Sequence, residues 1–157
     1  MGMVKQTIIS VIGAGDASEK DCKLAEAVGE EIARQGYTLL CGGMGGVMEA
    51  SCRGAKTQGG TTIGILPGSS KAEGNPYIDY PIVTAMGQGR NIIVASSCDA
   101  IIAIGGGFGT LSEIAFALRL KIPIIGIKTW DVSSDIKKAE TPEEAVYMAI
   151  GLIGTNT

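Results

Sequence analysis

The segment AIIAIGGGFGTLSEIAFALRLK, residues 100–121, joins an apolar run, a glycine-rich turn and a helix-like run in immediate succession. Residues 100–104 have the apolar, β-branched character of a buried strand, whereas residues 111–121 have the composition of a helix. A glycine-rich turn between a strand and a helix leaves backbone N–H groups facing outward, and the helix dipole adds partial positive charge there. The segment therefore predicts a strand–turn–helix unit whose turn binds an anionic group such as a phosphate.

Strand-like and helix-like runs alternate along the rest of the chain. Apolar, β-branched runs occupy residues 7–12, 37–41, 61–66, 80–84, 100–104 and 122–127, and helices are expected at about 24–35, 47–58, 89–99, 111–121 and from 141 onward. Most of the strand-like runs are apolar throughout, which is typical of parallel strands covered on both faces. We therefore predict one domain over residues 1–157, an α/β three-layer Rossmann-like sandwich. Its mostly parallel sheet would have six or seven strands in an order of about 3-2-1-4-5-6.

The composition excludes several classes of function. The 157-residue chain is 45% hydrophobic and 18% charged, and its net charge of −3 comes with basic residues that are scattered rather than gathered in a stripe. Because binding to nucleic acid needs many phosphate contacts, this charge argues against a nucleic-acid partner. The chain has no histidine, which excludes histidine-based catalytic triads and histidine metal ligands.

Cysteine spacing and hydropathy indicate the cellular setting. The four cysteines form no C-x-x-C pair, so no metal site is expected, and we interpret them as buried free thiols of a reducing compartment. Residues 1–10 lack the apolar core of a signal peptide, and no uninterrupted apolar run reaches the ~18 residues of a membrane span. We therefore expect a cytoplasmic protein with no membrane partner.

Two further glycine-rich turns follow the first two strand-like runs. Because the carboxyl ends of parallel strands share one edge of a sheet, these turns and the turn after residue 104 are expected to line a single pocket. Glycine in a short turn also serves to reach positive φ angles, and that alternative stays open for each position. The candidate ligand-binding glycines of the two turns are Gly13, Gly15, Gly42, Gly43, Gly45 and Gly46.

The glycine pattern differs from the two common nucleotide-binding motifs. The first turn lacks the third glycine of G-x-G-x-x-G, and the second strand-like run ends without an acidic residue to hold a ribose. No G-x-x-x-x-G-K-[ST] segment is present either. Ordinary NAD binding is therefore weakly supported, and a P-loop nucleotide hydrolase is excluded.

Arg90 and Glu113 are the two charged residues with a candidate role in binding or catalysis. Arg90 stands near the start of a helix, where a cation opposes the helix dipole, so an anionic ligand or Glu113 would compensate it; a solvated surface arginine is the alternative. Glu113 stands either beside a bound sugar, where it would stabilise positive charge or activate water, or in a capping box with Thr110. The residues alone leave these alternatives open.

Two helix-like runs, residues 114–118 and 145–150, are apolar over more than one face. A helix on the outside of a sheet needs only one apolar stripe. The excess predicts an interface between copies of the chain, and hence a homo-oligomer, with an unusually apolar core as the alternative.

The turn GRN at residues 89–91, together with GGGFGTLSE at residues 105–113, resembles the LOG (lonely guy) superfamily. Its members carry an Arg-Lys pair followed by P-G-G-x-G-T-x-x-E. The turn GGMGGVM at residues 42–48 resembles the second glycine-rich turn of the same superfamily, and the resemblance covers essentially the whole chain. The G-R-N turn and the G-G-G-x-G-T-L-S-E-I-A motif are most similar to the molybdenum-cofactor-carrier-like branch, with the DNA-processing protein A family as a more distant relative.

The resemblance implies a Rossmann-like domain that forms dimers or tetramers and binds a nucleotide-type phosphate on the third glycine-rich turn. In LOG enzymes the motif arginine and glutamate serve cleavage of the N-glycosidic bond of nucleoside 5′-monophosphates, and these roles would fall on Arg90 and Glu113. Gly105 stands in place of the motif proline and Asn91 in place of the motif lysine, which removes a positive charge and weakens the case for hydrolysis. The implied phosphate-binding residues are Gly106, Gly107, Gly109 and Thr110.

Three functions follow as hypotheses. The first is a binding protein for a phosphorylated, nucleotide-like ligand, such as the molybdenum cofactor or its pterin precursor, with no intrinsic cofactor and no metal ligands of its own. The second is a phosphoribohydrolase, in which Glu113 assists departure of the base and Arg90 orients the ribose or phosphate. The third is a purely structural oligomer, which would bind no nucleotide.

Overall fold

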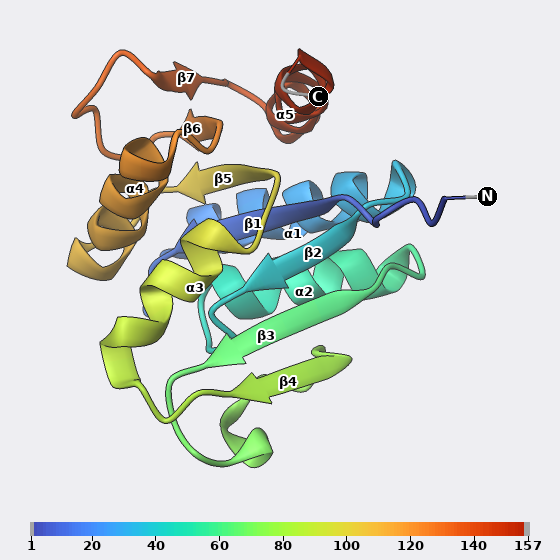
Figure 1. The fold of residues 1–157 in the computed structure, drawn as a ribbon, viewed down its shortest axis with the longest axis vertical. Coiled ribbons are helices and arrows are strands. Elements are labelled where there is room, and N and C mark those ends of the chain that lie inside the picture. The colour runs from blue at the N-terminus through green and yellow to red at the C-terminus, as the bar shows by residue number, and fades with distance from the viewer. Residues whose placement is uncertain (1, 156–157) are drawn as a thin grey trace.

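The apolar runs of the sequence become the strands of one sheet in the computed structural model, which describes residues 2–155 (Figure 1). The strands are β1 (Ile8–Gly13), β2 (Thr38–Cys41), β3 (Thr62–Leu66), β4 (Tyr80–Val83), β5 (Ala100–Ile104), β6 (Ile124–Ile127) and β7 (Ile136–Lys138). The α-helices are α1 (Glu19–Arg34), α2 (Val47–Thr57), α3 (Asn91–Ser96), α4 (Phe108–Leu120) and α5 (Pro142–Thr155). Short 3₁₀ helices, η1 (Lys71–Glu73) and η2 (Gly87–Arg90), precede β4 and α3.

The strand order is β4-β3-β2-β1-β5-β6-β7, and every described pair of neighbouring strands is parallel. The Rossmann-like architecture is confirmed, with one correction to the expected order of about 3-2-1-4-5-6. β4 lies at the sheet edge beside β3, and β5 takes the place next to β1. An edge suits β4 because Pro81 cannot donate to a second neighbour and because Ile82 and Val83 remain exposed. β7 supplies the seventh strand of the expected six or seven, but its location was not predicted, since only Ile136 of its three residues is buried.

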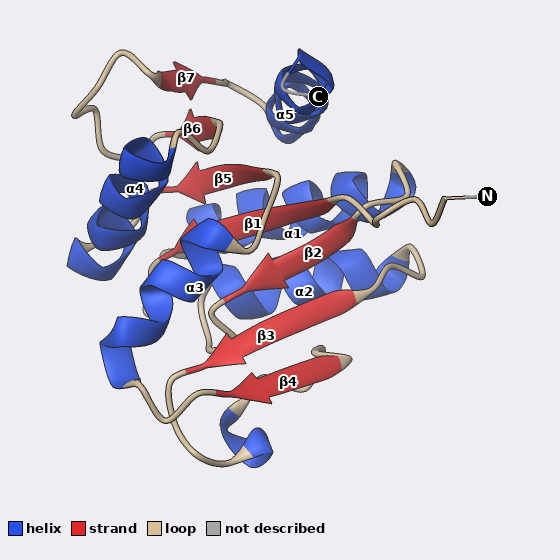
Figure 2. Cartoon of the chain, viewed as in Figure 1, coloured by secondary structure: helices blue, strands red, loops and turns tan. Residues whose placement is uncertain are grey.

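Both faces of the sheet are buried, which confirms the three-layer arrangement. Ile102 and Ile104 of β5 belong to the core under α1, α2 and α5, whereas Ile101 and Ala103 belong to the core under α3 and α4. Figure 2 shows α1 and α2 behind the strands, with α3 and α4 in front of them. This alternation explains why the central strands are apolar throughout, because successive side chains point to opposite, covered faces.

The centre of the sheet positions the candidate site. β1 pairs with β2 on one side and with β5 on the other, and Gly13 is in register with Ile104. β1 and β5 therefore end side by side, and the turns that follow them start at the same edge. From this pair the strands continue through β2, β3 and β4 on one side and through β6 and β7 on the other. Ligands bind at such a reversal of strand order in open α/β sheets.

Helix α4 begins at Phe108, earlier than the expected Leu111, and Gly107 is its N-cap. No side chain caps this end, so Thr110 lies inside the first turn rather than at the cap position. The expected capping box of Thr110 and Glu113 therefore does not form. Glu113 stands more than one turn inside the helix, where its direction is set by the helix face.

Helices α1 and α2 cross at two glycines. A Cβ placed on Gly29 would lie 1.9 Å from the carbonyl oxygen of Ser51, and a Cβ placed on Gly54 would lie 2.0 Å from that of Glu26. Such distances are far below van der Waals contact, so the crossing depends on the absence of side chains at both positions. The crossing fixes α2, which carries one wall of the site described below.

Alanine at either glycine is expected to destabilise the fold. Gly29→Ala and Gly54→Ala should each lower the free energy of unfolding by about 1–3 kcal/mol or more, because the helices must separate to admit a methyl group. Gly151→Ala in α5 is the matched control, since a Cβ there meets nothing within 4 Å. It should raise stability by up to ~1 kcal/mol. Urea unfolding followed by circular dichroism measures all three, and equal effects at the three sites would contradict the close crossing.

Candidate functional site

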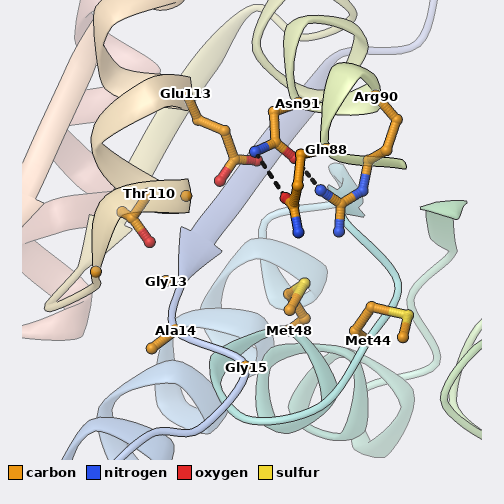
Figure 3. Close-up of a pocket in the computed structure, with 12 residues that line it drawn as sticks. Gly13, Ala14, Gly15, Met44, Met48, Gln88, Arg90, Asn91, Thr110 and Glu113 are labelled. Carbon is orange, nitrogen blue, oxygen red and sulfur yellow. Dashed lines mark hydrogen bonds between the residues drawn. The ribbon is translucent and has the colours of Figure 1, made fainter. Parts of the chain in front are cut away.

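A cavity of about 330 Å³ opens at the carboxyl edge of the sheet, beside the ends of β1 and β5. Figure 3 shows the groups arranged around it, which are the guanidinium of Arg90, the carboxyl group of Glu113, the amides of Gln88 and Asn91, and the thioethers of Met44 and Met48. The structure thus brings Arg90, Glu113 and glycines of the first and third turns to one cavity. The lining residues are Gly13, Ala14, Gly15, Met44, Met48, Gln88, Arg90, Asn91, Gly107, Gly109, Thr110 and Glu113.

The third glycine-rich turn presents free backbone donors at the cavity. The amide of Leu111 donates to the carbonyl of the N-cap Gly107 at 3.0 Å, which closes the first turn of α4. The N–H groups of residues 108–110 precede this bond and have no acceptor within residues 2–155. Three of the four predicted phosphate-binding residues, Gly107, Gly109 and Thr110, line the cavity beside these donors.

The loop after β6 holds the third turn from outside the cavity. Thr129 Oγ1 donates to the carbonyl oxygen of Gly105 at 2.7 Å, and Trp130 Nε1 donates to that of Gly107 at 3.0 Å. Between these anchors Gly106 adopts φ +105°, a conformation that side-chain-bearing residues rarely reach. Gly106 therefore shapes the turn, and it is not among the lining residues.

The second glycine-rich turn contributes a thioether rather than its glycines. Met44 of this turn and Met48 of α2 line the cavity. The carbonyl oxygen of Gly42 accepts from Arg90 Nη2 at 3.4 Å, and that of Gly43 accepts from the backbone N–H of Asn75 at 2.9 Å. None of the four predicted ligand-binding glycines of this turn lines the cavity, namely Gly42, Gly43, Gly45 and Gly46. They form the turn that carries Met44.

Arg90 is buried, with 6% of its surface exposed, so the alternative of a solvated surface arginine is wrong. Its Nε donates to the carbonyl oxygen of Ile65 at 3.0 Å, its Nη2 to that of Gly42, and its Nη1 to Asn91 Oδ1. The guanidinium thus ties the end of β3, the turn after β2 and the start of α3 together. Burial lowers the pKa of Arg90, and the negative charge of Glu113 opposes that shift.

Glu113 is 7% exposed and lines the cavity from α4 (Figure 3). Its carboxyl group makes no hydrogen bond and no ion pair with any residue of the described range 2–155. Burial raises the pKa of Glu113 to about 8, against the opposing effect of Arg90. At neutral pH the carboxyl group is therefore mostly protonated, and it is free to donate a proton or a hydrogen bond to a ligand.

Gln88 and Asn91 complete the wall, and neither was singled out as a ligand contact from the sequence. Asn91 is 2% exposed, and its Nδ2 donates to Gln88 Oε1 at 3.4 Å and to Ser112 Oγ at 3.1 Å. The only sequence signal was their spacing, since both amides lie within two residues of Arg90 in the segment GQGRN. That signal is weak, because exposed turns commonly contain such residues.

Three further observations limit the chemistry that the described residues can perform. Within residues 2–155, no group of three or more histidine, cysteine, aspartate or glutamate side chains is placed to hold a metal ion. Cys41 and Cys52 are free, buried thiols whose sulfur atoms lie 3.5 Å apart. None of the helices in this range combines the length and the apolar character needed to cross a membrane.

Comparisons with known proteins place the chain among described relatives over most of its length. The sequence model of the SLOG cluster4 family matches residues 6–151. The solved molybdenum cofactor binding protein of Rippkaea orientalis is 37% identical, with a TM-score of 0.91 over 96% of this chain and 99% of that chain. The molybdenum cofactor carrier protein of Chlamydomonas reinhardtii is 34% identical, with a TM-score of 0.88 over the same shares.

Other relatives match more distantly. The cytokinin riboside 5′-monophosphate phosphoribohydrolase of Mycobacterium marinum is 34% identical over 59% of this chain, and the match spans about half (51%) of that enzyme. DNA processing protein A of Streptococcus pneumoniae is 16% identical, with a TM-score of 0.74 over 90% of this chain and 61% of that chain, which is a likeness of fold alone. Together these matches confirm the expected resemblance to the LOG superfamily and its molybdenum-cofactor-carrier-like branch.

Replacement of Glu113 by glutamine is expected to change the pH dependence of stability. The folded chain holds the Glu113 proton with a pKa of about 8, against an ordinary value of 4.5, so folding loses stability as the pH rises between these values. Glu113→Gln removes this loss. Between pH 5 and pH 9, the free energy of unfolding of the variant should therefore rise by on the order of a few kcal/mol relative to that of the wild type. Urea unfolding measures this difference. A difference that is constant across this range would contradict a buried, protonated Glu113.

Proposed function

We propose that the cavity of this chain, which belongs to the SLOG cluster4 family, holds a phosphorylated, nucleotide-like ligand without consuming it. A molybdopterin-type cofactor is the favoured cargo. The two molybdenum cofactor proteins described above support this choice, because each aligns with 96% of this chain and with 99% of its own length. The chain would act as a carrier or store, and a metal would arrive with the cargo rather than on protein ligands.

The phosphate of the ligand is assigned to the start of α4. The free N–H groups of residues 108–110 and the dipole of the helix favour an anion there, and Thr110 adds a hydroxyl at the same wall. The ring system of the ligand is assigned to the space between Glu113 and the thioethers of Met44 and Met48. Polarizable sulfur makes favourable contacts with flat aromatic rings, which suits a pterin or a purine.

The observation that carries the proposal is how Arg90 uses its donors. Three of its nitrogens donate to protein oxygens, and Asn91 replaces the lysine that LOG enzymes carry beside this arginine. Among the described residues, the cavity lining therefore offers no free cation of the kind that would clamp the sugar phosphate during bond cleavage. This arrangement favours holding a ligand over turning it over.

Hydrolysis of a nucleoside 5′-monophosphate is the second candidate function, and Glu113 is the observation that favours it. A carboxyl group with a pKa of about 8 is protonated at neutral pH, as a general acid must be. In this reaction Glu113 would give its proton to a nitrogen of the departing base while the bond from C1′ to the base breaks. Water would then add to C1′ and return a proton to Glu113, with free base and ribose 5-phosphate as products.

Incubation with AMP separates the two functions. We expect calorimetry to detect binding and chromatography to recover the AMP intact after many hours. Release of adenine and ribose 5-phosphate by the wild type, lost in Glu113→Ala, would instead establish the hydrolase. The absence of binding by AMP, by a pterin phosphate and by ribose 5-phosphate would overturn both functions.

The phosphate assignment has a matched pair of variants at the first residue of α4. Phe108 is 83% exposed, and the extended backbone of Gly107 before it is compatible with a following proline. Phe108→Pro removes one free N–H and should weaken AMP binding about 10-fold or more, whereas Phe108→Ala keeps the N–H and serves as the control. Equal affinities of the two variants would place the phosphate elsewhere.

The proposal includes self-association through the outer surface of α3 and α4. Ile92, Phe116 and Leu120 leave 40%, 37% and 46% of their surfaces exposed there, which is consistent with the second apolar face expected for residues 114–118. A second copy of this chain would cover these side chains, because a helix on a sheet needs only its inner stripe to be apolar. The apolar run of α5 leaves only one large side chain, Tyr147, fully outside the core at 80% exposure.

Light scattering after size-exclusion chromatography tests this face. Phe116→Glu is expected to reduce the oligomer to a smaller species, because a charge would be buried in the contact. Tyr147→Glu on α5 is the control and should leave the mass unchanged. Dissociation by Tyr147→Glu alone would move the interface to α5, and a monomeric wild type would contradict self-association.

A further inference from the structure

Gln88 is a part of the cavity wall that the proposed phosphate and ring contacts do not use. We propose that Gln88 recognises a hydrogen-bond acceptor on the heterocycle of the ligand, with its amide NH₂ turned into the cavity by a relay from Arg90 through Asn91. The inference rests on the proposed function, because it assumes that a nucleotide-like ligand enters this cavity. It assigns the part of the ligand that Gln88 contacts.

The relay starts at Arg90, whose guanidinium can only donate hydrogen bonds. Its Nη1 contacts the side chain of Asn91, so the Asn91 atom at this contact must be the oxygen, Oδ1. The buried guanidinium is fixed by two further bonds, to the carbonyl oxygens of Ile65 and Gly42. Arg90 therefore sets the orientation of the Asn91 amide.

The second step passes through the donor side of Asn91. With Oδ1 toward Arg90, the Nδ2 group faces Ser112 Oγ at 3.1 Å and Gln88 Oε1 at 3.4 Å. The Ser112 hydroxyl gives its proton to the carbonyl of Gly109 at 2.6 Å, so it can only accept from Asn91. Ser112 thus requires a donor at this side of Asn91, which agrees with the orientation set by Arg90.

The third step fixes Gln88. Its amide contacts a donor, so the contacting atom is the oxygen and the NH₂ group lies on the other side. Figure 3 shows this nitrogen directed into the space above Met48. It has no acceptor within residues 2–155, and Gln88 lines the cavity, so an entering ligand meets two unpaired N–H groups there.

The kind of ligand group that Gln88 contacts follows from what the other walls of the cavity bind. The phosphate is assigned to the start of α4, so the acceptor at Gln88 belongs to the rest of the ligand. Glu113, protonated at neutral pH, and the Gln88 NH₂ group both offer hydrogen to the same cavity. Such a wall suits the ring nitrogens and carbonyl oxygens of a purine or a pterin, and a bound ring that lacks them would cover these donors without pairing them.

Gln88→Met tests the contact, because methionine matches glutamine in length and offers no N–H. Gln88 is exposed in the free chain, so the variant should keep the wild-type melting temperature. Its affinity for AMP should fall about 3- to 10-fold, while its affinity for ribose 5-phosphate, which has no heterocycle, stays unchanged. Unchanged AMP affinity, or an equal loss for both probes, would overturn the inference.

A double-mutant cycle tests the relay. Asn91→Asp keeps an acceptor for Arg90 but loses the donor to Gln88, so the Gln88 amide is free to turn. The added charge of Asn91→Asp weakens binding of any phosphorylated probe, so ribose 5-phosphate serves as the reference. We expect the affinity for AMP relative to ribose 5-phosphate to fall in the wild-type background and to fall no further in the Gln88→Met background. Additive losses would overturn the relay, even if the Gln88 contact itself holds. Failure of the wild type to bind either probe would instead count against the proposed function.

Discussion

The buried guanidinium of Arg90 is the interaction on which the site depends. A charge removed from water must be hydrogen-bonded, and Arg90 meets that requirement with oxygens from β3, from the turn after β2 and from the first residue of α3. These elements are distant in the chain and meet only at the carboxyl edge of the sheet. The same three bonds therefore satisfy the charge, anchor the glycine-rich turn and orient the amides that face the cavity.

Arg90 and Glu113 share the cavity without touching, and this separation decides its electrostatics. An ion pair would have held Glu113 ionised, whereas burial without a partner keeps its carboxyl group neutral near pH 7. The cavity then carries the positive charge of Arg90 and the positive end of the α4 dipole, and a neutral Glu113 does not cancel them. An anionic ligand with a neutral, hydrogen-bonding ring system matches that distribution better than a cationic or a purely apolar ligand does.

The sequence predicted the architecture well because one physical constraint, burial of the sheet on both faces, leaves its mark on every central strand. The place of β4 was harder, although Pro81 was a readable sign of an edge strand. Glu113 was predicted at the site but with two roles, and only the start of α4 at Phe108 removes the capping role. The burial of Arg90 was not predictable, because its acceptors belong to residues 42, 65 and 91 and meet through folding alone. Gln88 was missed because its place in the cavity wall likewise arises only through folding.

The hydrogen bond from Trp130 to Gly107 has a practical consequence. Trp130 is the single tryptophan of the chain, and its ring also stacks on Phe108, with ring centroids 6.1 Å apart. Its indole is thus bound to the N-cap of the helix that faces the cavity, and it is half-buried beside the exposed ring of Phe108. Any shift of the glycine turn changes the polarity around this one chromophore. The protein therefore contains its own fluorescent reporter of the position of this turn.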